Sequence, residues 1–498
     1  MQKYFIGVDL GTGSTKAVAL NENGKTLATV QHHYSVNSPQ HGYSEQNPTL
    51  IWLAFIDCIS NITAKIGYTP TAISFSSAMH SILPVDEAGN ALTDAMLWSD
   101  VRSGEIAEEL RSSAYAENIY RHTGTAIYAM SPLCKIMWLS KNNPTVFNNA
   151  YKFISLKEYV WFKLFGVFEI DYSMASATGM FDILNLKWYE KSLELAGISS
   201  SRLSTIVSTQ HKRSLKSGDN VAGINPSTIF VTGASDGCCA NLGGNAIKPG
   251  VAALTIGTSG AVRVGSTKPV YNFNAMTFNY LLKSNVFICG GAVNNGGAAL
   301  DWLLKNFLNT SNLSSDTYSQ VFKEIATVKA GSEGLVFLPY LYAERAPIWD
   351  AKSSGAFINI NAKHQQKHFL RAALEGICFA LNDVLNAVEQ PEISIQEIVI
   401  SGGFISSPVW VQVLADITGK RLSVLQSEDA SAVGAVYLAM DCLGVDIQTI
   451  MAKDTAGRTI IEPDMEAYQL YRKVFVVYKQ LYSNIRSSVH QLQVIDGL

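Results

Sequence analysis

The chain has few charges, no paired cysteine spacing and no long apolar run, and each absence excludes a class of protein. Its seven cysteines include no CxxC pair, which excludes the common zinc and dithiol motifs and predicts reduced thiols in a cytoplasmic protein. Charged residues make up 16% of the chain and the net charge is -3, so neither nucleic acid nor an anionic membrane is an expected partner. No apolar run reaches the ~18 residues of a membrane span, and Asp9 ends the first run too early for a signal peptide.

The chain is long and rich in apolar residues. With 498 residues, 47% of them hydrophobic, it is too long for one ordinary core, so two large domains are expected. The two halves are similar in plan, since each contains two β-prone runs joined by a turn of small residues. We place the division after residue 245, which gives an N-terminal domain of residues 1–245 and a C-terminal domain of residues 246–498.

The first small-residue turn joins the runs Tyr4–Leu10 and Lys16–Leu20 and reads Asp9-Leu10-Gly11-Thr12-Gly13-Ser14-Thr15-Lys16. Its glycines let backbone N–H groups approach an anion, and its hydroxyls and lysine add further donors. It is not a Walker loop, because GxxxxGK[ST] is absent and the turn joins strand to strand rather than strand to helix. The alternative interpretation is a tight hairpin that needs glycine only for a positive φ.

A second glycine-rich stretch covers residues 233–264. Asp236 lies on the turn Gly233–Gly237, between a β-prone run and a run of small residues, which predicts a strand, a turn and a helix. Further along, Ile256–Gly260 forms a tight turn between two β-branched runs. A lone carboxylate on a turn, followed by a small-residue hairpin, is what a phosphoryl-transfer site needs. The alternative role for Asp236 is that of a helix N-cap.

Polar residues also follow two apolar segments early in the chain. His80 follows the buried-type strand 72–76, and Trp98, Asp100 and Arg102 follow a second apolar segment. Open α/β sheets bind ligands at the ends of strands, so these residues are candidates for a binding site. Each also has a structural alternative, namely a satisfied buried histidine, a packed tryptophan and a surface ion pair.

Apolar periodicity and capping residues predict helices over 48–66, 132–143, 155–166, 295–308, 408–418, 430–443 and 464–494, and a polar loop over 171–177. The first of these helices has a strong start signal, Asn47 followed by Pro48. The last is amphipathic and rich in Tyr, Val and Leu, which leaves room for the interface of a homodimer.

The two turns and two longer motifs resemble the FGGY family of carbohydrate kinases. Residues 130–139, MSPLCKIMWL, look like the first family signature, and residues 355–375, ending HFLRAALE, look like the second. The second has Asn359 where glycine is usual, which we interpret as a local change of turn. The resemblance runs from residue 4 to about residue 440. It implies an α/β fold of two ribonuclease H-like (actin/hexokinase-type) domains flanking a central cleft that closes around both ligands.

The resemblance also implies roles, with the sugar and the base in the N-terminal domain and the nucleotide in the C-terminal domain. Asp236 is the implied general base for the substrate hydroxyl. Asp9, with Asp236, is the implied anchor of a Mg²⁺ that is held through water near the ATP phosphates. The other implied contacts are Thr12, Gly13, Gly257, Thr258 and Ser259 for the phosphates, Gly297, Asp301, Gly403 and Ser407 for the adenosine, and Met79, His80, Trp98, Asp100, Arg102 and Asp236 for the sugar.

Within the family, residues 42–48 and 74–81 are similar to those of gluconate kinases, which implies D-gluconate as substrate and ATP as phosphoryl donor. A xylulose kinase, or another pentulose or polyol kinase, is the sibling alternative, because xylulose kinases share the Met79-His80 pair. A non-catalytic sugar sensor or assembly module is the remote alternative, and it predicts a lost base or damaged glycine turns. Arg102, His80 and Lys135 are the candidates for binding the carboxylate of a sugar acid, with His80 first.

Overall fold

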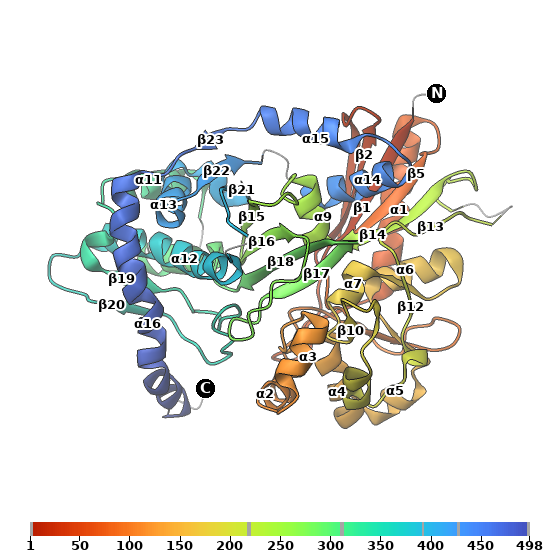
Figure 1. Ribbon diagram of the computed structural model, residues 1–498, viewed down its shortest axis with the longest axis horizontal. Helices are drawn as coiled ribbons and strands as arrows, with labels where there is room; N and C mark the ends of the chain where they lie inside the picture. Colours follow the sequence, from red (N-terminus) through yellow and green to blue (C-terminus); the bar gives the residue numbers. More distant parts are fainter. Residues whose placement is uncertain (1–2, 217–220, 309–312, 391–392, 426–428, 496–498) are drawn as a thin grey trace. The chain divides into compact units, whose positions relative to one another are not determined.

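The computed structural model describes residues 3–216, 221–308, 313–390, 393–425 and 429–495, and these form two compact units. The first contains Met1–Ile247, Ser266–Cys289 and Asp429–Ala456, and the second contains Lys248–Gly265, Gly290–Glu428 and Gly457–Leu498. The division expected from the sequence lies after residue 245. The structure also places Ser266–Cys289 and Asp429–Ala456 with the first unit. Figure 1 traces the elements of each unit along the chain.

The first unit is built on a mixed sheet with the strand order β13-β14-β5-β1-β2-β3. β1 (Tyr4–Leu10), β2 (Ser14–Asn21) and β3 (Thr26–His33) form an antiparallel meander. β5 (Ala72–Ser77) and β14 (Ile229–Ser235) continue the sheet as parallel strands, and β13 (Lys212–Arg213) pairs antiparallel at the edge. Three antiparallel strands followed by two parallel ones give the ribonuclease H-like arrangement that the sequence predicts.

Helices cover both faces of this sheet. Side chains alternate along β1, so Tyr4, Ile6 and Val8 pack in one core with α1 (Pro48–Ile66) and α6 (Leu156–Phe165). Phe5 lies on the opposite face, in a second core with α9 (Asp236–Gly243) and α14 (Ala430–Cys442). Because the sheet is buried on both sides, its central strands read as nearly continuous apolar runs.

The helix α1 begins and ends where the sequence predicts. Asn47 accepts a hydrogen bond from the Thr49 N–H, Pro48 is the first helical residue, and Gly67 ends the helix with φ 85°. Although the sequence has no unbroken apolar run of that length, α1 is long and apolar enough on average to cross a membrane. A core helix of a globular unit meets the same criterion, and α1 contributes Ile51 and Phe55 to the first core.

Short elements fill the rest of the first unit. The helices are α2 (Gly104–Arg111), α3 (Ala116–Thr123), α4 (Pro132–Asn142), α5 (Pro144–Asn149), α7 (Tyr172–Ser176), α8 (Glu190–Ala196) and α15 (Ile447–Ala456). The strands are β17 (Phe278–Lys283) and the pairs β4 (Glu45–Gln46) with β7 (Ala95–Met96), β6 (Leu83–Val85) with β8 (Lys152–Ile154), β9 (Glu169–Asp171) with β12 (Thr205–Val207) and β10 (Phe181–Asp182) with β11 (Lys187–Trp188). The predicted loop over 171–177 is wrong, because Asp171 caps α7 by accepting from the N–H groups of Ser173 and Met174.

The second unit repeats the strand order of the first. β18 (Val286–Val293), β16 (Gly260–Ser266), β15 (Val251–Ile256), β21 (Glu397–Ser401) and β22 (Arg421–Val424) take the places of β3, β2, β1, β5 and β14. β23 (Ile460–Ile461) pairs with β22 at the edge. The other elements are α10 (Gly297–Phe307), α11 (Ser315–Ile325), β19 (Val336–Leu338), β20 (Ala356–Ile358), α12 (Gln366–Val388), α13 (Pro408–Thr418) and α16 (Met465–Ile495). The two small-residue turns thus lie at equivalent hairpins, which confirms the similarity of plan.

Residues of the motif at 355–375 anchor the C-terminal helix α16. On α12, the Arg371 Nε donates to Glu375 Oε1 (2.8 Å), and the Tyr471 hydroxyl of α16 donates to the same oxygen (2.7 Å). All three side chains are buried. Asn359 adopts φ 67° and its Nδ2 donates to Gly334 O (3.0 Å), so asparagine occupies a left-handed conformation that glycine also favours.

Glycines let α14 approach β1 and α9 very closely. A Cβ on Gly7 of β1 would lie 1.9 Å from Ala432 O, and a Cβ on Gly434 of α14 would lie 1.9 Å from Cys239 O. Neither distance is possible for a real carbon atom, so both contacts require glycine. The close contact fixes the start of α14, next to Asp429.

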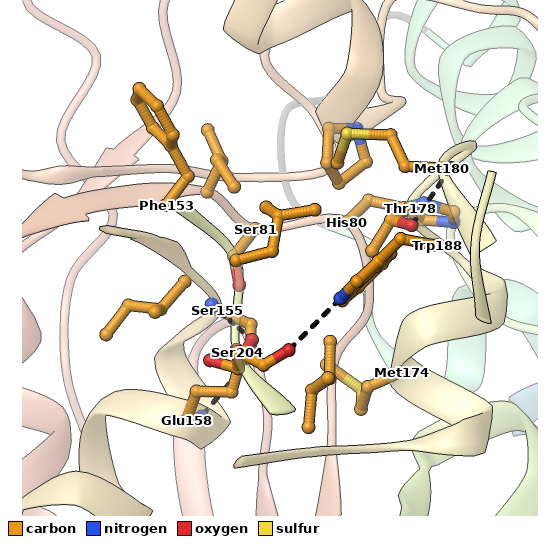
Figure 2. Close-up of a pocket in the computed structure, with 15 residues that line it drawn as sticks. His80, Ser81, Phe153, Ser155, Glu158, Met174, Thr178, Met180, Trp188 and Ser204 are labelled. Carbon is orange, nitrogen blue, oxygen red and sulfur yellow. Dashed lines mark hydrogen bonds between the residues drawn. The ribbon is translucent and has the colours of Figure 1, made fainter. Parts of the chain in front are cut away.

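A small cavity is buried in the first unit, and Figure 2 shows His80, Trp188, Met174 and Glu158 around it. Its volume of about 20 Å³ has room for roughly one water molecule and not for a sugar. The Glu158 carboxylate accepts from the Ser155 N–H (2.7 Å) in the capping box of α6. Burial raises the pKa of Glu158 to about 7.

The glycine contact predicts a strong destabilisation in Gly434→Ala, because the added Cβ forces the backbones of α14 and α9 apart. We expect the free energy of unfolding to fall by about 3 kcal/mol, measured as a lower urea midpoint. The control is Gly104→Ala at the start of α2, where a Cβ would meet no atom within 4 Å. Equal midpoints for the two variants would contradict the packing described.

Burial of Glu158 predicts a pH-dependent effect in Glu158→Gln, which keeps an acceptor for the Ser155 N–H. The folded pKa is raised, so the wild-type protein loses stability as the pH rises from the ordinary glutamate value through about 7. The variant should therefore gain stability relative to wild type by up to about 3 kcal/mol at pH 8 and by little at pH 5. Thermal denaturation at both pH values measures the difference, and a pH-independent difference would contradict it.

Candidate active site

The turn between β1 and β2 carries Thr12 and Gly13 and is held by side chains from elsewhere in the first unit. The Gln46 Nε2 donates to Thr12 O (2.8 Å), the Trp98 Nε1 donates to Thr12 Oγ1 (3.0 Å), and the Tyr34 hydroxyl donates to Gly11 O (2.7 Å). Neither Gly11 nor Gly13 has a positive φ, and a Cβ on Gly13 would meet no atom within 4 Å. A positive φ is therefore not the reason for glycine here, and the backbone at Gly13 is open to a ligand.

Asp236 is the first residue of α9 but does not cap it. The N-cap is Ser235, whose side chain accepts from the Cys238 N–H (3.4 Å). Asp236 Oδ1 accepts from the N–H of Gly237 (2.7 Å), and its side chain is only partly buried. The interpretation of Asp236 as the N-cap is therefore wrong, and a carboxylate at the first turn of a helix is stabilised in its ionised form.

Asp236 shares an acidic region with two other carboxylates. Asp9, at the end of β1, accepts from the Ser76 hydroxyl (2.6 Å), and Asp429 accepts from Lys16 Nζ (2.6 Å). Burial raises the pKa of Asp9 to about 6; the Ser76 bond and Lys16 oppose this, and the charges of Asp236 and Asp429 add to it.

The oxygen donors of this acidic region suit a hard cation such as Mg²⁺. Among the described residues no three His, Cys, Asp or Glu side chains are arranged to enclose a metal ion directly.

Asp100 and Arg102 form a buried ion pair rather than the surface pair considered as an alternative. The Arg102 Nε contacts both Asp100 oxygens (2.9 Å), and its Nη2 donates to Glu45 Oε1 (2.6 Å). The guanidinium lies over the ring of Tyr43, and its side chain is 6% exposed. Arg102 is therefore neutralised by two carboxylates of the chain, and Asp100 is fully buried behind it.

His80 and Lys135 are also committed to internal contacts. The His80 ring bonds through Nδ1 to Ala177 O (2.8 Å) and through Nε2 to the Tyr280 hydroxyl (3.3 Å), and His80 adopts φ 66°. Lys135 has no exposed surface and donates to His80 O (2.7 Å) and to Leu97 O (2.5 Å). Burial lowers the pKa of Lys135 to about 7. Because it is fully buried, Lys135 supports the segments of His80 and Trp98 and does not reach a ligand.

Met79, next to His80, is partly buried and packs against the second core. The structure thus brings Met79 and His80 into the same unit as Asp9, Thr12, Trp98 and Asp236.

A cavity of about 460 Å³ in the second unit brings together five of the residues implied for the nucleotide. These are Gly257, Thr258, Gly297, Asp301 and Gly403. The N–H of Gly297 donates to Gly257 O (2.7 Å), which ties the start of α10 to the hairpin β15–β16. A Cβ on Gly297 would lie 2.9 Å from that oxygen, so this contact favours glycine.

Two predicted residues do not line this cavity. Ser259 lies in the hairpin, where its carbonyl accepts from the Gly257 N–H (2.9 Å). Ser407 is 1% exposed and caps α13 by accepting from the Trp410 N–H (3.3 Å). Its neighbour Ser406 lines the cavity instead, because the chain turns into α13 at Ser407.

Sequence reasoning missed the aromatic wall of this cavity. Phe404, which follows Gly402-Gly403, lies against Trp410, with ring centroids 5.8 Å apart. Tyr318 donates from its hydroxyl to Asp301 Oδ1 (2.6 Å). The other lining residues that were not predicted are Ile256, Ala298, Ser315, Ser319 and Phe322. Residues of α11 carry no motif, and only the fold brings them to the cavity.

Known proteins match this chain over nearly its whole length. Residues 4–243 match the N-terminal domain of the FGGY family of carbohydrate kinases, and residues 252–441 match its C-terminal domain. The gluconokinase of Bacillus subtilis is 37% identical, with 99% of both chains covered.

Two solved structures from Lactobacillus acidophilus are also similar. Its gluconate kinase superposes with a TM-score of 0.92 at 31% identity and covers 99% of this chain and 100% of its own. Its ligand-bound xylulose kinase superposes with a TM-score of 0.91 at 31% identity and covers 98% of this chain and 100% of its own. With both family domains matched and the strand order repeated in each unit, the chain belongs to the FGGY family of carbohydrate kinases.

Proposed function

We propose that this chain transfers the terminal phosphoryl group of ATP to the 6-hydroxyl of D-gluconate and forms 6-phospho-D-gluconate. Asp236 is the observation that carries the proposal. Its carboxylate stands at the start of α9, is not needed as a cap, and lies in one acidic region with Asp9. Similarity to the Bacillus subtilis gluconokinase and to the Lactobacillus acidophilus gluconate kinase supports the choice of substrate.

In the proposed reaction Asp236 acts as general base. A sugar hydroxyl is a weak nucleophile, so its proton passes to the Asp236 carboxylate as the oxygen bonds to phosphorus and ADP leaves. Thr12 and Gly13 offer backbone N–H groups to the transferred phosphate, since the turn is open at Gly13. Asp9 and Asp236 would hold Mg²⁺ through water, where the ion neutralises phosphate charge.

The cavity of the second unit is the proposed ATP site. Its volume is within the usual range for small-molecule sites, and Phe404, Phe322 and Trp410 offer apolar surface to a base. Gly257, Thr258 and Ser259 are proposed to contact the phosphates through the hairpin. Gly297, Asp301 and Gly403 line the same cavity and are proposed contacts of the nucleoside.

Xylulose is the second candidate substrate, and one observation favours it. Arg102 and Lys135 are both committed to partners within the chain, so neither is available to bind the carboxylate of a sugar acid. Similarity to the xylulose kinase structure points the same way. Gluconate stays the first choice because residues 74–81 and 42–48 are similar to gluconate kinases, with Met79, His80 and Trp98 as proposed contacts.

We also propose that the enzyme works in the cytoplasm, where ATP and sugar acids are available. A homodimer through α16 is a further proposal, because Val476 and Val477 of that helix are more than half exposed. Size-exclusion chromatography with light scattering measures the mass.

Asp236→Asn should lower kcat by at least about 10²-fold, because an amide cannot accept the hydroxyl proton. The thermal midpoint should stay close to that of wild type, since Ser235 caps α9. The control is Asp441→Asn, which removes the ion pair between Asp441 and Lys283 (2.8 Å) and changes no candidate site residue. Nearly full activity in Asp236→Asn would reject Asp236 as the base.

A substrate panel tests the choice of gluconate. ADP release is measured with gluconate, xylulose, ribulose and glycerol at equal concentrations, and kcat/KM should be highest for gluconate. A higher value for xylulose would replace the substrate and leave the kinase assignment intact. ADP release that no substrate stimulates would reject the proposed activity.

A further inference from the structure

We infer that Gln46 is a positioning residue that holds the Thr12 turn in place against the segment of Trp98 and Arg102. The inference rests on the proposed function, in which Thr12 contacts the phosphate and residues 98–102 face the sugar. It assigns a role to a residue that the implied contacts do not include.

The side chain of Gln46 makes its hydrogen bond to the Thr12 turn, which is distant from Gln46 in the sequence. Its side chain lies in β4, is 1% exposed, and donates from Nε2 to Thr12 O at 2.8 Å. Its Oε1 has no hydrogen-bond partner among the described residues. A buried amide oxygen without a partner is unfavourable, and the bond to Thr12 O is the contact of this side chain that offsets the cost.

The carbonyl and the hydroxyl of Thr12 are both hydrogen-bonded. Its carbonyl accepts from Gln46, and its hydroxyl accepts from the Trp98 Nε1 at 3.0 Å. Gly11 and Gly13 on either side have no side chains that could anchor the turn. Gln46 and Trp98 therefore hold Thr12 itself, while Tyr34 and main-chain bonds hold Gly11 and Gly13.

The two donors belong to one rigid platform. β4 pairs antiparallel with β7, with Gln46 opposite Ala95, and the pairing continues where the Leu97 N–H donates to Ser44 O (2.9 Å). Glu45, the residue before Gln46 in β4, accepts from Arg102 Nη2 (2.6 Å). Gln46, Trp98 and Arg102 are thus tied together by main-chain and side-chain bonds.

This platform couples the proposed sugar contacts to the proposed phosphate contact. Displacement of the turn by about 1 Å can cost about 10²-fold in rate when reacting groups must be aligned. Loss of the Gln46 donor frees the Thr12 carbonyl and loosens the turn, while Trp98 and Arg102 keep their places on β7 and beyond. The expected signature is a fall in kcat with little change in KM for the sugar.

The kinetic test uses Gln46→Met, which keeps the size of the side chain and removes the donor. We expect kcat to fall by at least about 10-fold with KM for gluconate changed by less than about 3-fold. The matched control is Gln412→Met, because the Gln412 Nε2 also donates to a main-chain carbonyl, Glu462 O (3.1 Å), but on α13. A kcat within about 2-fold of wild type, or equal losses in both variants, would overturn the inference.

A second variant separates positioning from packing. In Gln46→Glu the ionised carboxylate repels the Thr12 carbonyl, whereas the protonated acid can donate to it. Burial raises the pKa of such a glutamate, so the ratio of variant to wild-type kcat should rise as the pH falls from 8 to 6. A ratio that does not rise as the pH falls would contradict the inference.

Hydrogen exchange tests the inference without any substrate, which separates its failure from failure of the proposed function. In the ligand-free full-length protein, amides of residues 10–14 should exchange at least about 10-fold faster in Gln46→Met than in wild type or Gln412→Met. Unchanged exchange there, in a folded Gln46→Met variant, would overturn the inference even if the kinase is active. Faster exchange in a chain that phosphorylates no sugar would support the positioning role alone.

Discussion

The close contact of α14 with β1 and α9 is the constraint on which the candidate active site of the first unit depends. Gly7 and Gly434 allow backbones to touch where any side chain would separate them. Asp429 lies directly before α14 and Ser431 in its first turn, where the Ser431 hydroxyl donates to Asp236 O (3.3 Å). The strand that carries Asp9 and the helix that begins with Asp236 are thereby held together by α14, which lies some two hundred residues further along the chain.

Burial and the neighbouring carboxylates raise the pKa of Asp9, and one hydrogen bond, from Ser76, and one lysine, Lys16, oppose them. Asp9, Asp236 and Asp429 together form an acidic region, which favours a cation. The proposed role of Mg²⁺ follows from this acidic region as well as from the phosphates.

Much of the fold was predictable from sequence because local signals agree with it. Asn47-Pro48 and Gly67 fix the ends of α1, and both small-residue turns lie in the predicted hairpins. The prediction failed where a polar side chain caps a short helix, a role that its residue type alone does not reveal. Small polar residues at 171–177 read as a loop but form α7 because Asp171 supplies the cap.

The candidate site residues likewise divide into those that a local motif predicts and those whose contacts it cannot predict. Motifs made Asp9, Asp236 and the two turns candidates, since phosphoryl transfer needs those residue types in that pattern. Sequence could not show that Lys135 is fully buried, that Arg102 is neutralised by Asp100 and Glu45, or that Ser407 caps α13. Each of these depends on contacts between residues far apart in the chain or on a local change of direction.

The most direct test of the account is the identity of the phosphorylated product. Wild-type protein incubated with ATP, Mg²⁺ and D-gluconate is followed by ³¹P nuclear magnetic resonance, which distinguishes phosphate esters by their position. The account predicts 6-phospho-D-gluconate in equal amount to ADP. Inorganic phosphate as the only new species, or a phosphate ester at another hydroxyl, would contradict it.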